Sequence, residues 1–122
     1  MIPTALDAIV AAGLALPGAT LSIQWGDSRV LKVGGKMFTW ASFHQERWLL
    51  SFKASDTAFD MLREQPGFRP APYLGRAGWI ALDSLEVLPL PDIIGYVTLA
   101  HGLILAKLSK RAQAAIASGA KL

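Results

Sequence analysis

The fold is decided by the stretch Leu21–Lys53, LSIQWGDSRVLKVGGKMFTWASFHQERWLLSFK, in which apolar and polar residues alternate over four short runs. Every second side chain of a strand points to the same face, so this alternation predicts a sheet with one buried and one solvated face. We therefore expect a four-stranded antiparallel β-meander. Its buried face is expected to carry Leu21, Ile23, Trp25, Leu31, Val33, Phe38, Trp40, Trp48, Leu50 and Phe52. Its outer face is expected to carry Val30, Lys32, Met37, Thr39, Leu49, Ser51 and Lys53.

The turn between the second and third runs sets the register of those two strands. Gly34-Gly35 is typical of a two-residue hairpin loop, because glycine readily adopts the positive φ that such loops need. This loop would pair Val33 with Lys36 and Leu31 with Phe38. Both pairs keep the expected apolar residues on one face of the sheet.

The first turn could contain two or three residues. A two-residue loop would point Leu21, Ile23 and Trp25 away from the buried face. A one-residue change of register moves every side chain of a strand to the opposite face of the sheet. A three-residue loop, Gly26-Asp27-Ser28, keeps them on that face and pairs Ile23 with Leu31 and Leu21 with Val33. We therefore expect the three-residue loop.

The residues on either side of the meander predict helices and two further strand segments. Ser55 has the character of an N-cap for a helix that stops before Pro66. Pro70 and Pro72 restrict residues 68–74 to an irregular or edge segment. The other expected elements are a helix over 4–14, a strand over 78–82, a long helix from Asp92 to about Lys110 and a helical tail over 112–117.

The element order is therefore α-β-β-β-β-α-β-(β)-α. Alternation in the strands and helical periodicity around them predict one α+β domain over residues 1–122, with helices covering one face of an antiparallel sheet. A length of 122 residues suits a single domain.

Composition narrows the possible functions. The chain has no cysteine, which excludes disulfides and thiolate metal sites and is compatible with the cytoplasmic location that we expect. Its net charge of +3 is mildly basic. The longest uncharged run, residues 93–106, is 14 residues long, and a membrane-spanning helix needs about 20. We expect no membrane partner and interpret the run as a buried helix with a surface that can pack against a second copy of the chain.

Several stretches, in this order, resemble the MmcQ/YjbR family of small bacterial proteins. They are LPGA at 16–19, WGD at 25–27, KVGGKMF at 32–38, LSFK at 50–53, PGFRPAPYL at 66–74, GWIALD at 78–83 and AKLSKR at 106–111. The resemblance implies a CyaY-like, double-wing fold and the DNA-binding label often given to that family. The sequence departs from the family's pattern at Ala54, where relatives often carry cysteine, and at 88–92, which lacks the usual acidic pair.

A CyaY-like fold raises the question of frataxin-type iron binding. That activity needs a cluster of carboxylates on the first helix and its neighbouring strand, and the first helix here has only Asp7. Hard cations need several converging oxygen ligands. We expect neither a metal nor a cofactor.

No catalytic arrangement is recognisable in the sequence. The two histidines, His44 and His101, fit a solvated turn and an apolar helix respectively. Gly34-Gly35-Lys36 lacks the spacing of a phosphate loop, and no Gly-x-Ser-x-Gly motif occurs. Lys32 and Lys53 could serve as catalytic lysines only if they were desolvated. We therefore expect a binding protein rather than an enzyme.

The functional hypothesis is a basic and aromatic surface that binds DNA, because cations contact phosphates and exposed rings stack on bases. Its expected residues are Lys32, Lys53, Arg69, Tyr73, Arg76, Lys107, Lys110 and Arg111. The alternative is a protein-interaction or small-ligand module that acts as a homodimer through the last long helix, without nucleic acid.

Overall fold

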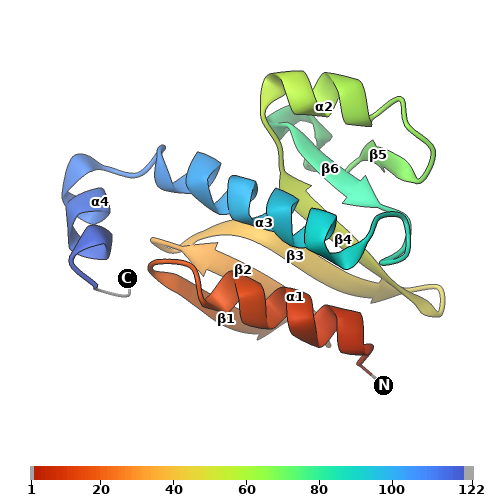
Figure 1. Cartoon of the computed structure of the whole chain (residues 1–122), viewed down its shortest axis with the longest axis horizontal. Helices are drawn as coiled ribbons and strands as arrows, with labels where there is room; N and C mark the ends of the chain where they lie inside the picture. The colour runs from red at the N-terminus through yellow and green to blue at the C-terminus, as the bar shows by residue number, and fades with distance from the viewer. Residues whose placement is uncertain (1, 120–122) are drawn as a thin grey trace.

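The computed structural model describes residues 2–119, and it confirms the α+β class and the order of the elements (Figure 1). The elements are α1 (Thr4–Leu14), β1 (Ala19–Gln24), β2 (Ser28–Val33), β3 (Lys36–His44), β4 (Arg47–Lys53), α2 (Asp56–Leu62), β5 (Phe68–Pro70), the 3-10 turn η1 (Gly75–Ala77), β6 (Trp79–Leu82), α3 (Leu90–Leu105) and α4 (Lys110–Ala117). The strands form one antiparallel sheet in the order β1-β2-β3-β4-β6-β5.

Helices α1 and α3 lie side by side across one face of this sheet (Figure 1). Leu6 and Ile9 of α1 and Ile93 and Val97 of α3 are buried in the core beneath them. Burial of apolar surface is the main favourable term in folding. The helix-covered face therefore holds the principal hydrophobic core.

Two serine caps set where the shorter helices begin. The Ser55 hydroxyl accepts a hydrogen bond from the Ala58 backbone N–H, which confirms the predicted N-cap of α2. Ser109 caps α4 in the same way, accepting from the Ala112 N–H. The prediction of one helix from Asp92 to about Lys110 was therefore wrong at its end. A new cap at Ser109 starts a separate helix, to which Lys110 belongs.

A β-bulge in β3 exchanges the faces of two predicted residues. Val33 pairs with Lys36 as expected, but the register shifts beyond Lys32, and Leu31 pairs with Thr39 instead of Phe38. Thr39 therefore lies on the helix-covered face, where it is buried, and Trp40 turns to the opposite face. The predicted positions of Thr39 and Trp40 were wrong for this reason.

The first turn is a three-residue loop, as expected, but it consists of residues 25–27. Leu21 consequently pairs with Leu31 and Ile23 with Arg29, so the predicted pairs of Ile23 with Leu31 and Leu21 with Val33 were wrong by two residues. A shift of two residues preserves the face. However, β1 is an edge strand, and Leu21, Ile23 and Trp25 are 36%, 58% and 67% exposed rather than buried.

The outer face of the sheet carries a small apolar cluster of its own. Ala71, Trp79 and Ala81 are buried there, with Trp40 packed against them. The proline-rich segment after β5 supplies Ala71, and β5 itself is a short edge strand as predicted. The outer face, which carries Lys32 as predicted, is therefore partly covered rather than open.

Replacing Thr39 with valine is expected to stabilise the protein. Thr39 is 1% exposed, and within residues 2–119 its hydroxyl has no hydrogen-bond partner. Removing a buried, unsatisfied hydroxyl while keeping the side-chain shape should raise the free energy of unfolding by about 1 kcal/mol. Urea denaturation would measure this difference. Thr20→Val, at a partly exposed site on β1, is the control, and a loss of stability in Thr39→Val would contradict the prediction.

Candidate functional site

An open groove of about 560 Å³ lies between α2, η1 and the end of α3. We call it the basic groove, and its lining residues are Lys53, Asp56, Phe59, Asp60, Gly75, Arg76, Ala77, Gly78 and Lys107. Its three cations come from segments that are far apart in the sequence: the end of β4, η1 and the link after α3. The fold thus brings three cations together from distant segments, and Asp56 and Asp60 of the same groove offset part of their charge.

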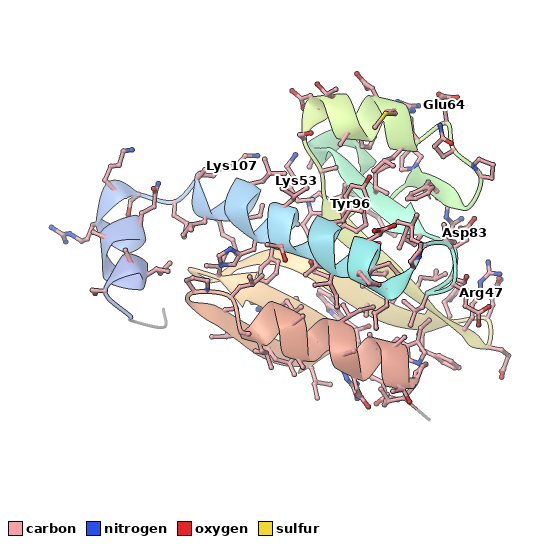
Figure 2. The ribbon with its side chains drawn as sticks, in the orientation of Figure 1. Arg47, Lys53, Glu64, Asp83, Tyr96 and Lys107 are labelled. Atoms are coloured by element: carbon pink, nitrogen blue, oxygen red, sulfur yellow. The ribbon has the colours of Figure 1, made fainter. Side chains whose placement is uncertain are left out.

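Lys53 is the fixed cation of this groove. It is 8% exposed, and its Nζ donates a hydrogen bond of 2.7 Å to the Ala77 carbonyl oxygen. A Cβ atom at Gly78, where φ is +80°, would lie 2.6 Å from the same Nζ, so glycine leaves room for the ammonium. Lys53 pairs with Trp79 of the outer-face cluster, as its predicted face requires, but the expectation of a solvated lysine was wrong, because its side chain is buried at the end of the strand. Figure 2 shows it in the space between α3 and α2, near Tyr96.

The surroundings of Lys53 disfavour its charge. Burial lowers the pKa of Lys53 below its ordinary value of 10.5, repulsion from Lys107 lowers it further, and attraction to Asp56 opposes both effects. An anion bound between Lys53 and Lys107 would relieve this repulsion and restore the charged form. The electrostatics of the groove therefore suit an anionic ligand.

The lowered pKa of Lys53 predicts a pH-dependent contribution to stability. Below 10.5 the unfolded chain binds a proton at Lys53 more readily than the folded chain does. Stability from this group is therefore fully present above 10.5 and is lost as the pH falls through the lowered folded pKa. We compare the free energy of unfolding of the wild type with that of the Lys53→Met variant. The wild-type value minus the variant value should increase as the pH rises from neutral toward 10.5. Urea denaturation at several pH values would measure it, with Lys36→Met as an exposed-lysine control. A constant difference would contradict the prediction.

The structure brings three of the eight expected residues together. Arg76 and Lys107 are exposed and line the basic groove with Lys53. The other five lie elsewhere: Lys32 on the outer face of β2, Arg69 on β5, Tyr73 in the loop after β5, and Lys110 and Arg111 in the first turn of α4. The dispersed members therefore do not form one continuous surface with the groove residues.

Two of these five have distinctive surroundings. Arg69 forms an ion pair of 3.1 Å with Asp83, so its charge is partly neutralised. Tyr73 is fully exposed and has a φ of +66°, which is uncommon for a residue other than glycine. An exposed ring in a constrained loop remains available for stacking.

Three groove residues were missed by sequence reasoning: Asp56, Phe59 and Asp60, all on α2. Residues three and four apart share one face of a helix, so their spacing was the available signal. What the spacing did not indicate is that this face of α2 points toward η1 and the end of α3.

An apolar groove adjoins the basic groove, and Lys53 lines both. The apolar groove is lined by Lys53, Ala54, Ser55, Ala58, Tyr96, Leu99 and Leu103, and its volume is about 100 Å³. Tyr96 stacks on buried Phe52, with ring centroids 5.3 Å apart, and Leu99 is 64% exposed. A ligand at Lys53 would therefore meet apolar surface on its α3 side.

The remaining chemical groups have structural roles or no partners for catalysis. The His101 ring is buried, stacks edge-to-face on Phe38 and donates from Nε2 to the Pro17 carbonyl oxygen at 2.7 Å, which ties α3 to the turn before β1. His44 is exposed at the end of β3. Within residues 2–119, no three histidine or acidic side chains are grouped so as to hold a metal ion. No helix in that part of the chain is long and apolar enough to cross a membrane.

A six-stranded antiparallel sheet covered by helices on one face, with a groove of three cations at the end of one central strand, defines a small α+β domain. The chain belongs to the YjbR family, whose model matches residues 14–103. This confirms the resemblance to MmcQ/YjbR proteins.

A solved structure shares the whole fold. It is the crystal structure of the Deinococcus radiodurans protein DR2400, which carries a DUF419 domain. Its TM-score against this chain is 0.80 at 18% sequence identity, and the match covers 96% of this chain and 95% of that one. No curated protein matches the chain.

Proposed function

We propose that this protein is a non-enzymatic, cytoplasmic binding protein for nucleic acid, and that DNA phosphates occupy the basic groove. The observation that carries the proposal is the convergence of Lys53, Arg76 and Lys107 on one groove from three separate segments. Phosphate contacts supply most of the affinity in non-specific nucleic-acid binding. Phe59 is half-buried in the same groove, and the Arg63 guanidinium lies over its ring at 5.4 Å from the centroid, so a base would stack there by displacing Arg63.

The charge balance of the groove restricts where a phosphate can lie. Asp56 and Asp60 line the groove along α2 and oppose the three cations. A phosphate is therefore expected near η1 and the end of α3, where Arg76 and Lys107 are exposed and free to reach it. Lys53 would act as a fixed charge behind them, because its hydrogen bond to Ala77 holds it in place.

A salt titration tests this function. If the three groove cations contact phosphates of a short duplex, log K should fall with log salt concentration at a slope of about −2.7. Lys107→Ala should reduce the magnitude of this slope by about 0.9, because one phosphate contact is lost. Arg47→Ala, which removes an exposed cation at the far end of the β3–β4 hairpin (Figure 2), should leave the slope unchanged. Absence of binding at low salt, or a flat salt response, would contradict the proposal.

The apolar groove favours one alternative, a small anionic ligand with an apolar tail. Its head would contact Lys53 while its tail lay along Tyr96, Leu99 and Leu103. Decanoate is a suitable probe, because it has this chemistry and carries no phosphate. Saturable binding of decanoate that is weakened by Leu99→Glu, together with no binding of DNA, would favour the alternative. The alternative predicted from the sequence also includes a homodimer that forms through α3.

A further inference from the structure

We propose that a second copy of this chain pairs antiparallel with residues Thr20–Gln24 at the outer edge of β1, so that two sheets join into one across a two-fold axis. The proposal rests on the backbone and side chains of β1 and does not depend on the proposed nucleic-acid function. The basic groove lies at the other end of the sheet order, beyond β4 and β6, so each of the two proposals can fail without the other.

The two edges of the sheet differ in their protection. Figure 1 shows β1 and β5 at opposite ends of the sheet. The β5 edge is three residues long, and it contains Pro70 and the charged Arg69, which are the usual features that prevent strand addition. The part of the β1 edge that follows Ala19, Thr20–Gln24, has the sequence TLSIQ and contains neither proline nor a charged residue. An unprotected edge of this kind presents backbone N–H and C=O groups that another strand can bind.

Side chains of β1 add apolar surface to this edge. Leu21 and Ile23 lie on the helix-covered side, since they pair with Leu31 and Arg29, yet they are 36% and 58% exposed. Trp25, directly after the strand, is 67% exposed although its ring contacts Trp40 at a centroid distance of 5.3 Å. Neither α1 nor any other described element covers these three side chains fully. A second β1 would bury them.

One register makes the edge self-complementary. A two-fold axis at Ser22 places Leu21 opposite Ile23 of the other protomer, and Thr20 opposite its Gln24. Directly opposed residues of antiparallel strands point to the same face, so the apolar pairs meet on the helix-covered side and the polar pairs on the outer side. This register uses every residue from Thr20 to Gln24 and opposes no like charges, because the strand has none. A closed two-fold contact also prevents further growth through β1.

Sedimentation velocity of the full chain tests the interface. We expect the wild type to form dimers at roughly 100 μM, and Ile23→Lys to weaken dimerisation by about tenfold or more, because charged residues protect edge strands. The matched control is Leu99→Lys, which places the same charge at an exposed leucine of α3 and should leave dimerisation unchanged. A wild type that stays monomeric would overturn the proposal. A dimer that survives Ile23→Lys, or that only Leu99→Lys disrupts, would assign the interface to another surface.

The absence of cysteine allows a direct test of the register. Ser22→Cys would place two thiols across the two-fold axis, where opposed Cβ atoms lie about 4.5–5.5 Å apart. Mild oxidation should therefore link most of this variant into covalent dimers. Thr57→Cys, which places an exposed thiol on α2 near β5 and β6, at the other end of the sheet from β1, should link only by random collision. Equal rates of linkage for the two variants would overturn the proposed register.

Discussion

The double replacement Arg76→Glu and Lys107→Glu is expected to abolish DNA binding by a correctly folded protein. These are the two exposed cations of the basic groove, and within residues 2–119 neither of them forms an ion pair. A hydrogen bond to a charged group contributes about 1.5–3 kcal/mol, so losing two phosphate contacts should weaken binding roughly 100-fold or more. Fluorescence anisotropy with a labelled short duplex at low salt would measure the loss.

The control variant must change the net charge as much as the Arg76→Glu, Lys107→Glu variant does, at residues that do not line the basic groove. Lys36→Glu with Arg47→Glu has the same effect on net charge, and both residues are exposed at hairpin ends outside the groove. This control should lose far less affinity than the groove variant. Equal losses in the two variants would show that only overall charge matters and would remove the groove from the proposal.

Replacing Phe52 with alanine should cause the largest loss of stability of any single change considered for this protein. Phe52 is fully buried in β4, opposite Thr39 and Ile80 in the sheet, and its ring stacks on Tyr96 of α3 at 5.3 Å. Truncating a buried phenylalanine removes its transfer free energy and leaves a cavity, at a cost of about 3–5 kcal/mol. Because small domains have a total stability of about 5–15 kcal/mol, the variant should unfold at a much lower urea concentration.

An exposed phenylalanine on the neighbouring strand provides the matched control. Phe43 is 52% exposed and contacts Trp48 only through one tilted ring pair. Phe43→Ala should cost less than about 1 kcal/mol, because surface substitutions have small effects. Comparable losses at Phe43 and Phe52 would contradict the assignment of Phe52 to the core and of Phe43 to the exposed end of the sheet.

The alternation of residues predicted the strands well, but it could not predict the bulge. The register between β2 and β3 depends on the extra residue near Phe38, and nothing in the run KMFTW distinguishes a regular strand from a bulged one. Thr39 and Trp40 therefore exchanged faces relative to expectation. A bulge is selected by packing against neighbouring strands and helices, which a single strand's pattern does not contain.

The basic groove shows the same division between local and tertiary information. The sequence predicted Lys53, Arg76 and Lys107, which line one groove, but it grouped them with five further residues that lie elsewhere. Residues that are 23 and 31 positions apart can meet only through the path of the chain, and no periodicity reports that path. The groove became recognisable only once β4, η1 and α3 had been placed.

By itself, the sequence determined the elements, their order and the family, because strand alternation, helix caps and turn glycines are local signals that survive without tertiary contacts. Tertiary structure alone decided which predicted core residues are covered. Leu21, Ile23 and Trp25 have the pattern of buried residues, yet the first two lie on an edge strand that α1 covers only in part, and Trp25 follows that strand with its ring against Trp40 of the outer face. It also decided that Lys53 is buried rather than solvated, because the neighbours that desolvate it come from α2, η1 and α3. Coverage and charge environment depend on which distant segments pack together, and that is a property of the whole fold.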